Sequence, residues 1–175
     1  MGNQNWRTPP EFFAGLDQEF HFTLDAAASH EDHLCKRYCT QDGTWDGMYD
    51  ISPNDGLDYN WAKHSVWCNP PYGNVEPWVK KARDSAISGA LVVMLLAPAV
   101  DTKWFHKYVW DHRLHRPRGD VEVRFLQGRI RFIHPDPEKR VTDFKGFRPI
   151  SGNMVVVFHP SENPPTQGCD EQIPA

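Results

Sequence analysis

The sequence lacks the features that would mark a membrane-spanning or secreted protein. Its longest apolar run, at 90–100, is shorter than the roughly 18 residues that a helix needs to cross a bilayer. The first residues contain no basic stretch followed by an apolar one, which a secretory signal would require. The four cysteines are scattered and indicate no disulfide framework. We therefore expect a cytoplasmic protein with no membrane partner.

Metal ligands are also sparse. His30, His33, Cys35 and Cys39 lie close together in the chain, but no CxxC pair is present, and three residues separate the two cysteines. We favour a loop with surface histidines and part-buried cysteines, and so predict no metal. Zinc binding at these four side chains stays the alternative.

Basic residues are too few to make the whole chain cationic, but they are unevenly placed. The formal net charge is −4 and the pI is about 6.1. Residues 103–148 nevertheless carry twelve Lys and Arg against six Asp and Glu, together with four histidines. A basic segment in an otherwise acidic chain is typical of a protein that binds phosphate groups through one surface. A solvated, charge-rich loop is the alternative.

The apolar pattern predicts one α/β domain. A helix at 10–20 is expected to begin with Thr8 as its cap and prolines in its first turn. Gln127 and Gly128 predict a hairpin turn between two strands. The other expected elements are strands at 22–26, 65–68, 90–97, 121–126, 129–133 and 154–159, helices at 75–88 and 101–110 (the latter capped by Asp101), and a long loop at 40–60. Alternating strands and helices favour a sheet that is parallel at its centre, with helices on both faces and an antiparallel C-terminal edge.

The strongest functional signal is Asn69-Pro70-Pro71-Tyr72, directly after the predicted strand at 65–68. Two successive prolines stiffen the backbone, so the Asn69 side-chain oxygen and the Pro70 carbonyl become acceptors held in fixed directions. Two such acceptors would draw an adenine amino nitrogen toward tetrahedral geometry and concentrate its lone pair for attack. Tyr72 supplies a flat face for the base, and stacking of this kind contributes roughly 1–3 kcal/mol. A proline turn that merely ends a strand is the structural alternative.

Two weaker motifs lie nearer the N-terminus. The segment 24–29 (Leu-Asp-Ala-Ala-Ala-Ser) follows the first strand, and its small side chains permit a nucleoside cofactor to approach the backbone. Asp25 would either accept a hydrogen bond from that cofactor or orient the loop. A Trp-x-Thr-Pro element at 6–9 precedes the first helix, and taken alone it is an ordinary helix start.

The order of these motifs along residues 6–159 resembles the phage-type, Dam-like DNA N6-adenine methyltransferase family. After the motifs above come Asp-Gly-Leu at 55–57, the Asn-Pro-Pro-Tyr tetrapeptide, an apolar strand and Gly-Arg-Ile-Arg-Phe at 128–132. The chain departs from the family's pattern where Ala-Ala-Ala-Ser replaces a commonly glycine-rich turn. Residues 40–54 look like an insertion. No large separate target-recognition domain is present, so only the basic segment at about 112–147 could recognise the DNA sequence.

The resemblance implies a Rossmann-like, S-adenosylmethionine-dependent methyltransferase fold that acts on double-stranded DNA. It implies cofactor contacts at Trp6, Thr8, Pro9, Asp25, Ala26, Ala27 and Asp55. It implies catalysis at Asn69, Pro70, Pro71 and Tyr72. Expected DNA contacts are Tyr72, Phe132, Arg116, Arg118, Arg129 and Arg131. The acid that meets the cofactor is left open among Asp42, Asp46, Asp50, Asp55 and Asp58.

The predicted reaction transfers a methyl group from S-adenosylmethionine to the N6 amino group of an adenine rotated out of the DNA helix. Methylation of RNA adenine or of a protein glutamine amide is one alternative, because those amino groups need the same two acceptors. A DNA-binding or anti-restriction protein without catalysis is another. We expect a single domain over 1–160, with 103–148 facing DNA, followed by a flexible tail at 161–175.

Overall fold

The computed structural model describes residues 7–40, 55–134 and 152–162. In chain order the elements are α1 (Pro10–Phe20), β1 (Leu24–Ala28), β2 (Tyr38–Thr40), β3 (Ser65–Cys68), α2 (Glu76–Ile87), β4 (Leu91–Leu96), the π-helix η1 (Phe105–Val109), β5 (Trp110–Asp111), β6 (Arg116–Pro117), β7 (Val121–Phe125) and β8 (Met154–Phe158). Among the described helices, none has both the length and the apolar character needed to cross a membrane.

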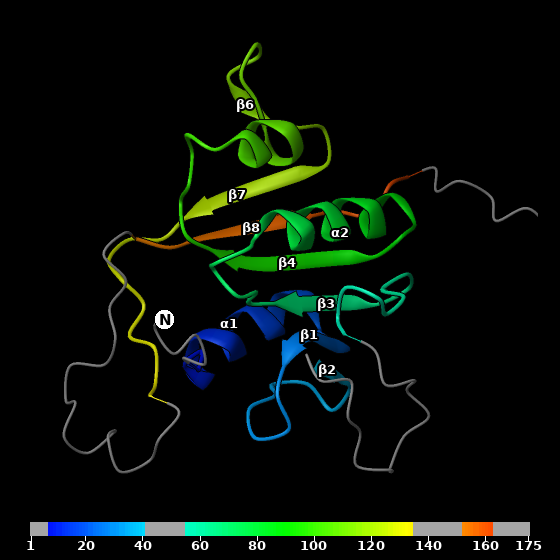
Figure 1. The fold of residues 1–175 in the computed structure, drawn as a ribbon, viewed down its shortest axis with the longest axis vertical. Coiled ribbons are helices and arrows are strands. Elements are labelled where there is room, and N and C mark those ends of the chain that lie inside the picture. The colour runs from blue at the N-terminus through cyan, green and yellow to red at the C-terminus, as the bar shows by residue number, and fades with distance from the viewer. Residues whose placement is uncertain (1–6, 41–54, 135–151, 163–175) are drawn as a thin grey trace, which may run out of the picture.

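Six strands form one sheet in the order β2-β1-β3-β4-β8-β7, and Figure 1 shows its central strands stacked one above the other. β2, β1, β3 and β4 run parallel to one another, while β8 is antiparallel to both β4 and β7. The prediction of a mostly parallel sheet with an antiparallel C-terminal edge is therefore confirmed.

Helices cover both faces of this sheet, as predicted. On one face α2 and η1 pack over Val92, Met94 and Leu96 of β4, and on the other α1 packs over Val93 and Leu95. Successive side chains of a strand point to opposite faces, so a strand that is covered twice must be apolar at every position. This explains the continuous apolar run that the sequence shows at 90–97.

Two sequence predictions about local structure are wrong. Residues 129–133 do not form a strand paired with β7, because β7 pairs instead with β8. Ile130 and Phe132 of this segment pack instead against the α1 face of the sheet. The predicted helix at 101–110 is reduced to a short helical segment ending at Val109, and Thr102 rather than Asp101 accepts the backbone N–H of Phe105.

Strand β2 and the two-stranded β5–β6 hairpin were not predicted, because strands of two or three residues carry no readable period. Thr8 does not cap α1 either: the cap position is Pro9, and no side chain bonds to the helix start. The remaining predicted elements among the described residues agree with the structure to within two residues at each end.

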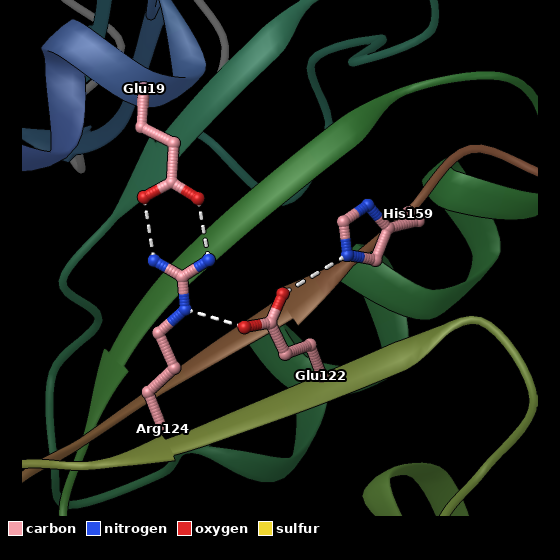
Figure 2. A network of polar contacts seen from close by, with 4 residues as sticks. All are labelled: Glu19, Glu122, Arg124 and His159. Carbon is pink, nitrogen blue, oxygen red and sulfur yellow. Dashed lines mark hydrogen bonds and ion pairs between the residues drawn. The ribbon is translucent and has the colours of Figure 1, made fainter.

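A polar network joins the end of α1 to the edge strand β7 (Figure 2). The guanidinium of Arg124 donates two hydrogen bonds to the Glu19 carboxylate, at 2.5 and 2.6 Å, and a third at 2.6 Å to Glu122. His159 lies 3.4 Å from the other oxygen of Glu122. Arg124 also lies over the ring of Phe20. This basic residue of the 103–148 segment therefore fixes α1 to the sheet.

Candidate functional site

The strand order identifies one edge of the sheet as the place for a ligand. From β1 the chain first runs to β2 on one side of β1, and then to β3 on its other side. Open sheets bind ligands outside the carboxyl ends of strands at such a reversal, because the connections leave there in opposite directions. Asp25 to Ala28 lie in β1 itself instead of following the first strand as predicted, with Asp25 beside Trp67 of β3, and Asn69 follows β3 directly. The two motifs thus flank this edge.

The Asn-Pro-Pro-Tyr corner contacts the Thr-Pro element. The side-chain amide of Asn69 donates from Nδ2 to the hydroxyl oxygen of Thr8, 3.2 Å away, and Thr8 is only 6% exposed. Within the described residues, no donor engages either Asn69 Oδ1 or the Pro70 carbonyl. Because the amide is planar, the bond to Thr8 also fixes the direction of Oδ1. The corner therefore leaves two oxygen acceptors that no described donor engages.

Tyr72 lies at the surface of this corner with its hydroxyl turned inward. Its side chain is among the exposed large hydrophobic residues, at 37%. The hydroxyl oxygen accepts a hydrogen bond from Nδ2 of Asn153, 3.4 Å away. Burial of that hydroxyl raises the pKa of Tyr72 well above its usual value. The ring is therefore neutral, held at its far end, and accessible to a stacking partner.

Asp25 is buried near the start of β1, and its carboxylate orders the loop that follows the strand. Its carboxylate accepts the backbone N–H of Leu34 at 3.0 Å and that of Ala27 at 3.4 Å, and the residue is 4% exposed. Burial raises the pKa of Asp25 to about 7, against the opposing effect of these two hydrogen bonds. Of the two roles considered for Asp25, these contacts are those of a loop-orienting residue.

The Asp-Gly-Leu turn packs directly on the end of β1. A Cβ at Gly56 would lie 1.9 Å from the carbonyl oxygen of Ala26 and 3.0 Å from the ring of Trp78. The indole N–H of Trp61 donates to the Gly56 carbonyl at 2.8 Å, in the buried interior. Asp55 is half-buried, and its carboxylate accepts the backbone N–H of Leu57. Only glycine permits this approach, which brings Asp55 to the same edge as Ala26.

The N-terminal segment also brings two arginines to this region. Arg7, next to Thr8, forms an antiparallel bridge with Ile133 through two backbone hydrogen bonds of 2.9 Å. Arg129 and Arg131 precede Ile133 on the same segment, and both are exposed. They alternate with the inward-facing Ile130 and Phe132, which explains why the positive side chains face solvent.

Other predicted DNA contacts lie elsewhere. Phe132 is 3% exposed within the α1-side core, so its ring is not available as a second stacking face. Arg118 donates from Nε and Nη2 to the His106 carbonyl, at 3.1 and 2.7 Å, which holds the β5–β6 hairpin to η1. Arg116 is exposed on that hairpin, which stands away from the sheet at the top of Figure 1. Trp6 and the acids at 42, 46 and 50 lie outside the described residues, and Asp58 is exposed.

The histidines and cysteines considered as metal ligands differ in their surroundings. His33 stacks on Tyr38 with ring centroids 4.1 Å apart, and Cys35 and Cys39 are buried. Burial raises the pKa of both thiols to about 12, so both stay protonated at neutral pH. Among the residues described, no group of three side chains is arranged to hold a metal ion.

Comparison with known proteins adds an independent finding. A family model described as DNA N-6-adenine-methyltransferase (Dam) matches residues 2–167. A DNA N-6-adenine-methyltransferase of Escherichia phage T1 is 33% identical over 145 residues, which cover 78% of this chain and 56% of that protein. A protein of the same description from Haemophilus phage HP1 (strain HP1c1) is 32% identical over 159 residues, covering 89% of this chain and 78% of its own length. The chain thus spans little more than half the length of the T1 protein.

Proposed function

We propose that this chain, which belongs to the DNA N-6-adenine-methyltransferase (Dam) family, methylates the N6 amino group of adenine in DNA with S-adenosylmethionine as the donor. The observation that carries the proposal is the pair of oxygens at the Asn69-Pro70 corner, which no described donor engages. An adenine amino group has two N–H bonds, and one rigid acceptor for each is the complement it requires.

The residues at the end of β1 suit the proposed cofactor. The strand order, with the chain reversing at β1, favours a doubly wound, Rossmann-like sheet in which a nucleoside lies outside β1 and β3. Ala27 at the end of β1 is part-buried and would meet the nucleoside, whereas Ala26 is 0% exposed and is covered by the turn at Gly56, which brings Asp55 to the same place. Thr8 and Pro9 neighbour Asn69, and we assign them to the methionine end. When bound, S-adenosylmethionine would supply an electrophilic methyl group on a positively charged sulfur.

The chain's own contribution to the reaction is to hold the adenine. Asn69 Oδ1 and the Pro70 carbonyl accept the two amino hydrogens, and Tyr72 stacks on the ring. Because Thr8 fixes the Asn69 amide, its oxygen needs no reorganisation as positive charge develops on the amino nitrogen. The amino nitrogen held there would bond to the methyl carbon as the sulfur–methyl bond breaks, with S-adenosylhomocysteine as the leaving group, and would afterwards lose one proton to solvent. Alignment and fixed dipoles, rather than a metal or a covalent intermediate, supply the rate in this mechanism.

Double-stranded DNA is the proposed partner, because the target base must be held outside its helix. Arg129 and Arg131 are exposed on the segment whose Ile133 bridges to Arg7, next to Thr8. We propose that they contact phosphates beside the extruded base. Arg116 on the β5–β6 hairpin would make a more distant contact. Arg118 and Phe132 are left out of the proposed interface because both are engaged internally. We assign these roles to one domain over 1–160.

The direct experiment replaces Asn69 with Ala. Purified wild type and variant are incubated with unmethylated plasmid DNA and the cofactor, and N6-methyldeoxyadenosine is measured by mass spectrometry of the digested DNA. Loss of one pre-organised polar group should lower kcat by about 10²- to 10³-fold. The cofactor dissociation constant, measured by calorimetry, should change little, because Asn69 is assigned to the base. The matched control is Asn74→Ala, an exposed asparagine on the same loop.

RNA and glutamine-containing peptides serve as competing acceptors in the same assay. Methylation of either in preference to DNA would replace the proposed substrate. An Asn69→Ala protein that methylates DNA at the wild-type rate would refute the proposed catalytic corner.

A further inference from the structure

Asn153 is a buried polar residue that the sequence motifs do not identify. It is 2% exposed and immediately precedes the wholly apolar strand β8. Its Nδ2 donates to the Tyr72 hydroxyl, and within the described residues its buried Oδ1 has no hydrogen-bond partner. A buried amide that is half satisfied is uncommon in folded proteins and weakens the fold. Stability therefore does not explain why an amide stands here.

The position of Asn153 is set by the sheet. Met154 pairs with Leu96, the last residue of β4, so Asn153 lies at the carboxyl end of β4, where β8 enters the sheet (Figure 1). β4 is the neighbour of β3, whose end carries Asn69. The backbone of Asn153 is fixed as well, because its carbonyl accepts the N–H of Leu126 at 3.1 Å. A rigid amide thus lies at the same edge as the proposed catalytic corner.

The contact with Tyr72 has a geometric consequence. A tyrosine ring on a surface loop swings about its first side-chain torsion, and an anchored hydroxyl limits that swing. The ring of Tyr72 is exposed, so packing alone does not set its position. The hydrogen bond of 3.4 Å from Asn153 is the polar contact that restricts it. Hydrogen bonds at active sites are often long before the substrate is bound.

We propose that Asn153 is a positioning residue, which fixes where the Tyr72 ring lies and so places the stacked adenine beside the two acceptors at Asn69 and Pro70. This role rests on the proposed function. Asn153 acts through Tyr72 and need not touch the base. Its amide is therefore expected to increase the rate of methyl transfer while lowering the stability of the folded protein.

The test uses Asn153→Leu, which has a similar volume and removes the unpaired oxygen, together with Tyr72→Phe and the double variant. Full-length proteins are compared for kcat and KM with unmethylated plasmid DNA, for cofactor affinity, and for thermal midpoint. Asn153→Leu is expected to lower kcat about tenfold, to leave cofactor affinity unchanged, and to keep or raise the thermal midpoint. Tyr72→Phe should lower kcat by a similar factor. The double variant should lose no more than the larger single loss, because both changes remove one interaction. Asn153→Ala serves as a second variant, with kcat expressed per folded molecule, and Asn74→Leu is the matched control.

The possible results separate this role from the proposed function. A wild type that transfers no methyl group to DNA refutes both. If the wild type is active, an unchanged kcat in Asn153→Leu refutes the positioning role alone. Losses that multiply to about a hundredfold in the double variant would show that Asn153 does not act through Tyr72. A thermal midpoint that falls while kcat per folded molecule stays at the wild-type value would make the residue merely structural.

Discussion

The close approach of Gly56 to β1 allows the most quantitative prediction. Ordinary van der Waals contact for a Cβ begins at 3.4 Å, but a methyl group at position 56 would stand 1.9 Å from the Ala26 carbonyl oxygen. In Gly56→Ala the turn and the strand must therefore separate by roughly 1.5 Å. Overpacking of this kind costs about 1–3 kcal/mol. The movement also strains the buried hydrogen bond from Trp61 to the Gly56 carbonyl, whose loss would cost about 1–3 kcal/mol more.

The expected loss of stability for Gly56→Ala is thus about 2–6 kcal/mol, which for a chain of this size lowers the thermal midpoint by roughly 4–24 °C. Cofactor affinity should fall as well, because the displaced turn carries Asp55 and lies against Ala26. Differential scanning calorimetry and titration with S-adenosylhomocysteine measure the two effects. The matched control is Gly15→Ala on α1, where a Cβ meets nothing within 4 Å and the helix should gain about 0.5–1 kcal/mol. An unchanged midpoint and unchanged affinity in Gly56→Ala would refute the close packing of this turn on β1.

Three further predictions concern charged residues. Burial raises the pKa of Asp25 to about 7, from about 4 in the unfolded chain, so the folded state binds this proton more tightly, and the contribution of Asp25 to stability falls as pH rises from about 4 to about 7. The urea midpoint of Asp25→Asn should therefore decline less between pH 5 and pH 8 than the urea midpoint of wild type. Parallel declines in the two proteins would contradict the burial of Asp25. Arg129→Gln and Arg131→Gln should each reduce the slope of log DNA affinity against log salt concentration by about 0.9. Arg118→Gln should lower the thermal midpoint without altering that slope. Equal slopes in wild type and all three variants would refute the proposed phosphate contacts. Arg124→Met should lower the urea midpoint slightly and leave kcat unchanged. The decrease in the urea midpoint should be smaller in 1 M salt, because the ion pairs of Figure 2 are partly exposed and salt screens them. An equal decrease at low and high salt would mean that the packing of Arg124 on Phe20 dominates.

Much of the sheet was predictable because its strands carry strong patterns. The apolar run at 90–97 could only be a strand covered on both faces, and the short strand before Asn69 ended where two prolines forbid further pairing. Placing the Asn-Pro-Pro-Tyr corner at a carboxyl edge followed from these two patterns.

The pairing partner of the segment 129–133 was not predicted, nor was the burial of Phe132. The segment was predicted as a strand beside 121–126 with Phe132 facing DNA, but it packs Ile130 and Phe132 on the α1 face and bridges to Arg7 instead of pairing with β7. Period-2 alternation reports which side of a strand is buried and carries no information about its neighbour. The predicted hairpin failed for this reason.

Contacts between distant side chains could not be predicted at all. Thr8 had the sequence context of a helix cap, yet its hydroxyl oxygen accepts a hydrogen bond from the side chain of Asn69, 61 positions away. Asn153 is one polar residue before an apolar strand, a context with no motif value, and only its burial and its bond to Tyr72 single it out. Asp25 was open to two roles until the structure placed its carboxylate on the N–H of Leu34.

A crystal structure of the protein soaked with S-adenosylhomocysteine would test the central claim most directly. The account predicts the nucleoside outside the ends of β1 and β3, against Ala27 and the turn at Gly56, with the sulfur facing Asn69. Binding in the separate hollow between Phe22, Asp17 and Arg37 on the α1 side, with the β1–β3 edge covered, would contradict it.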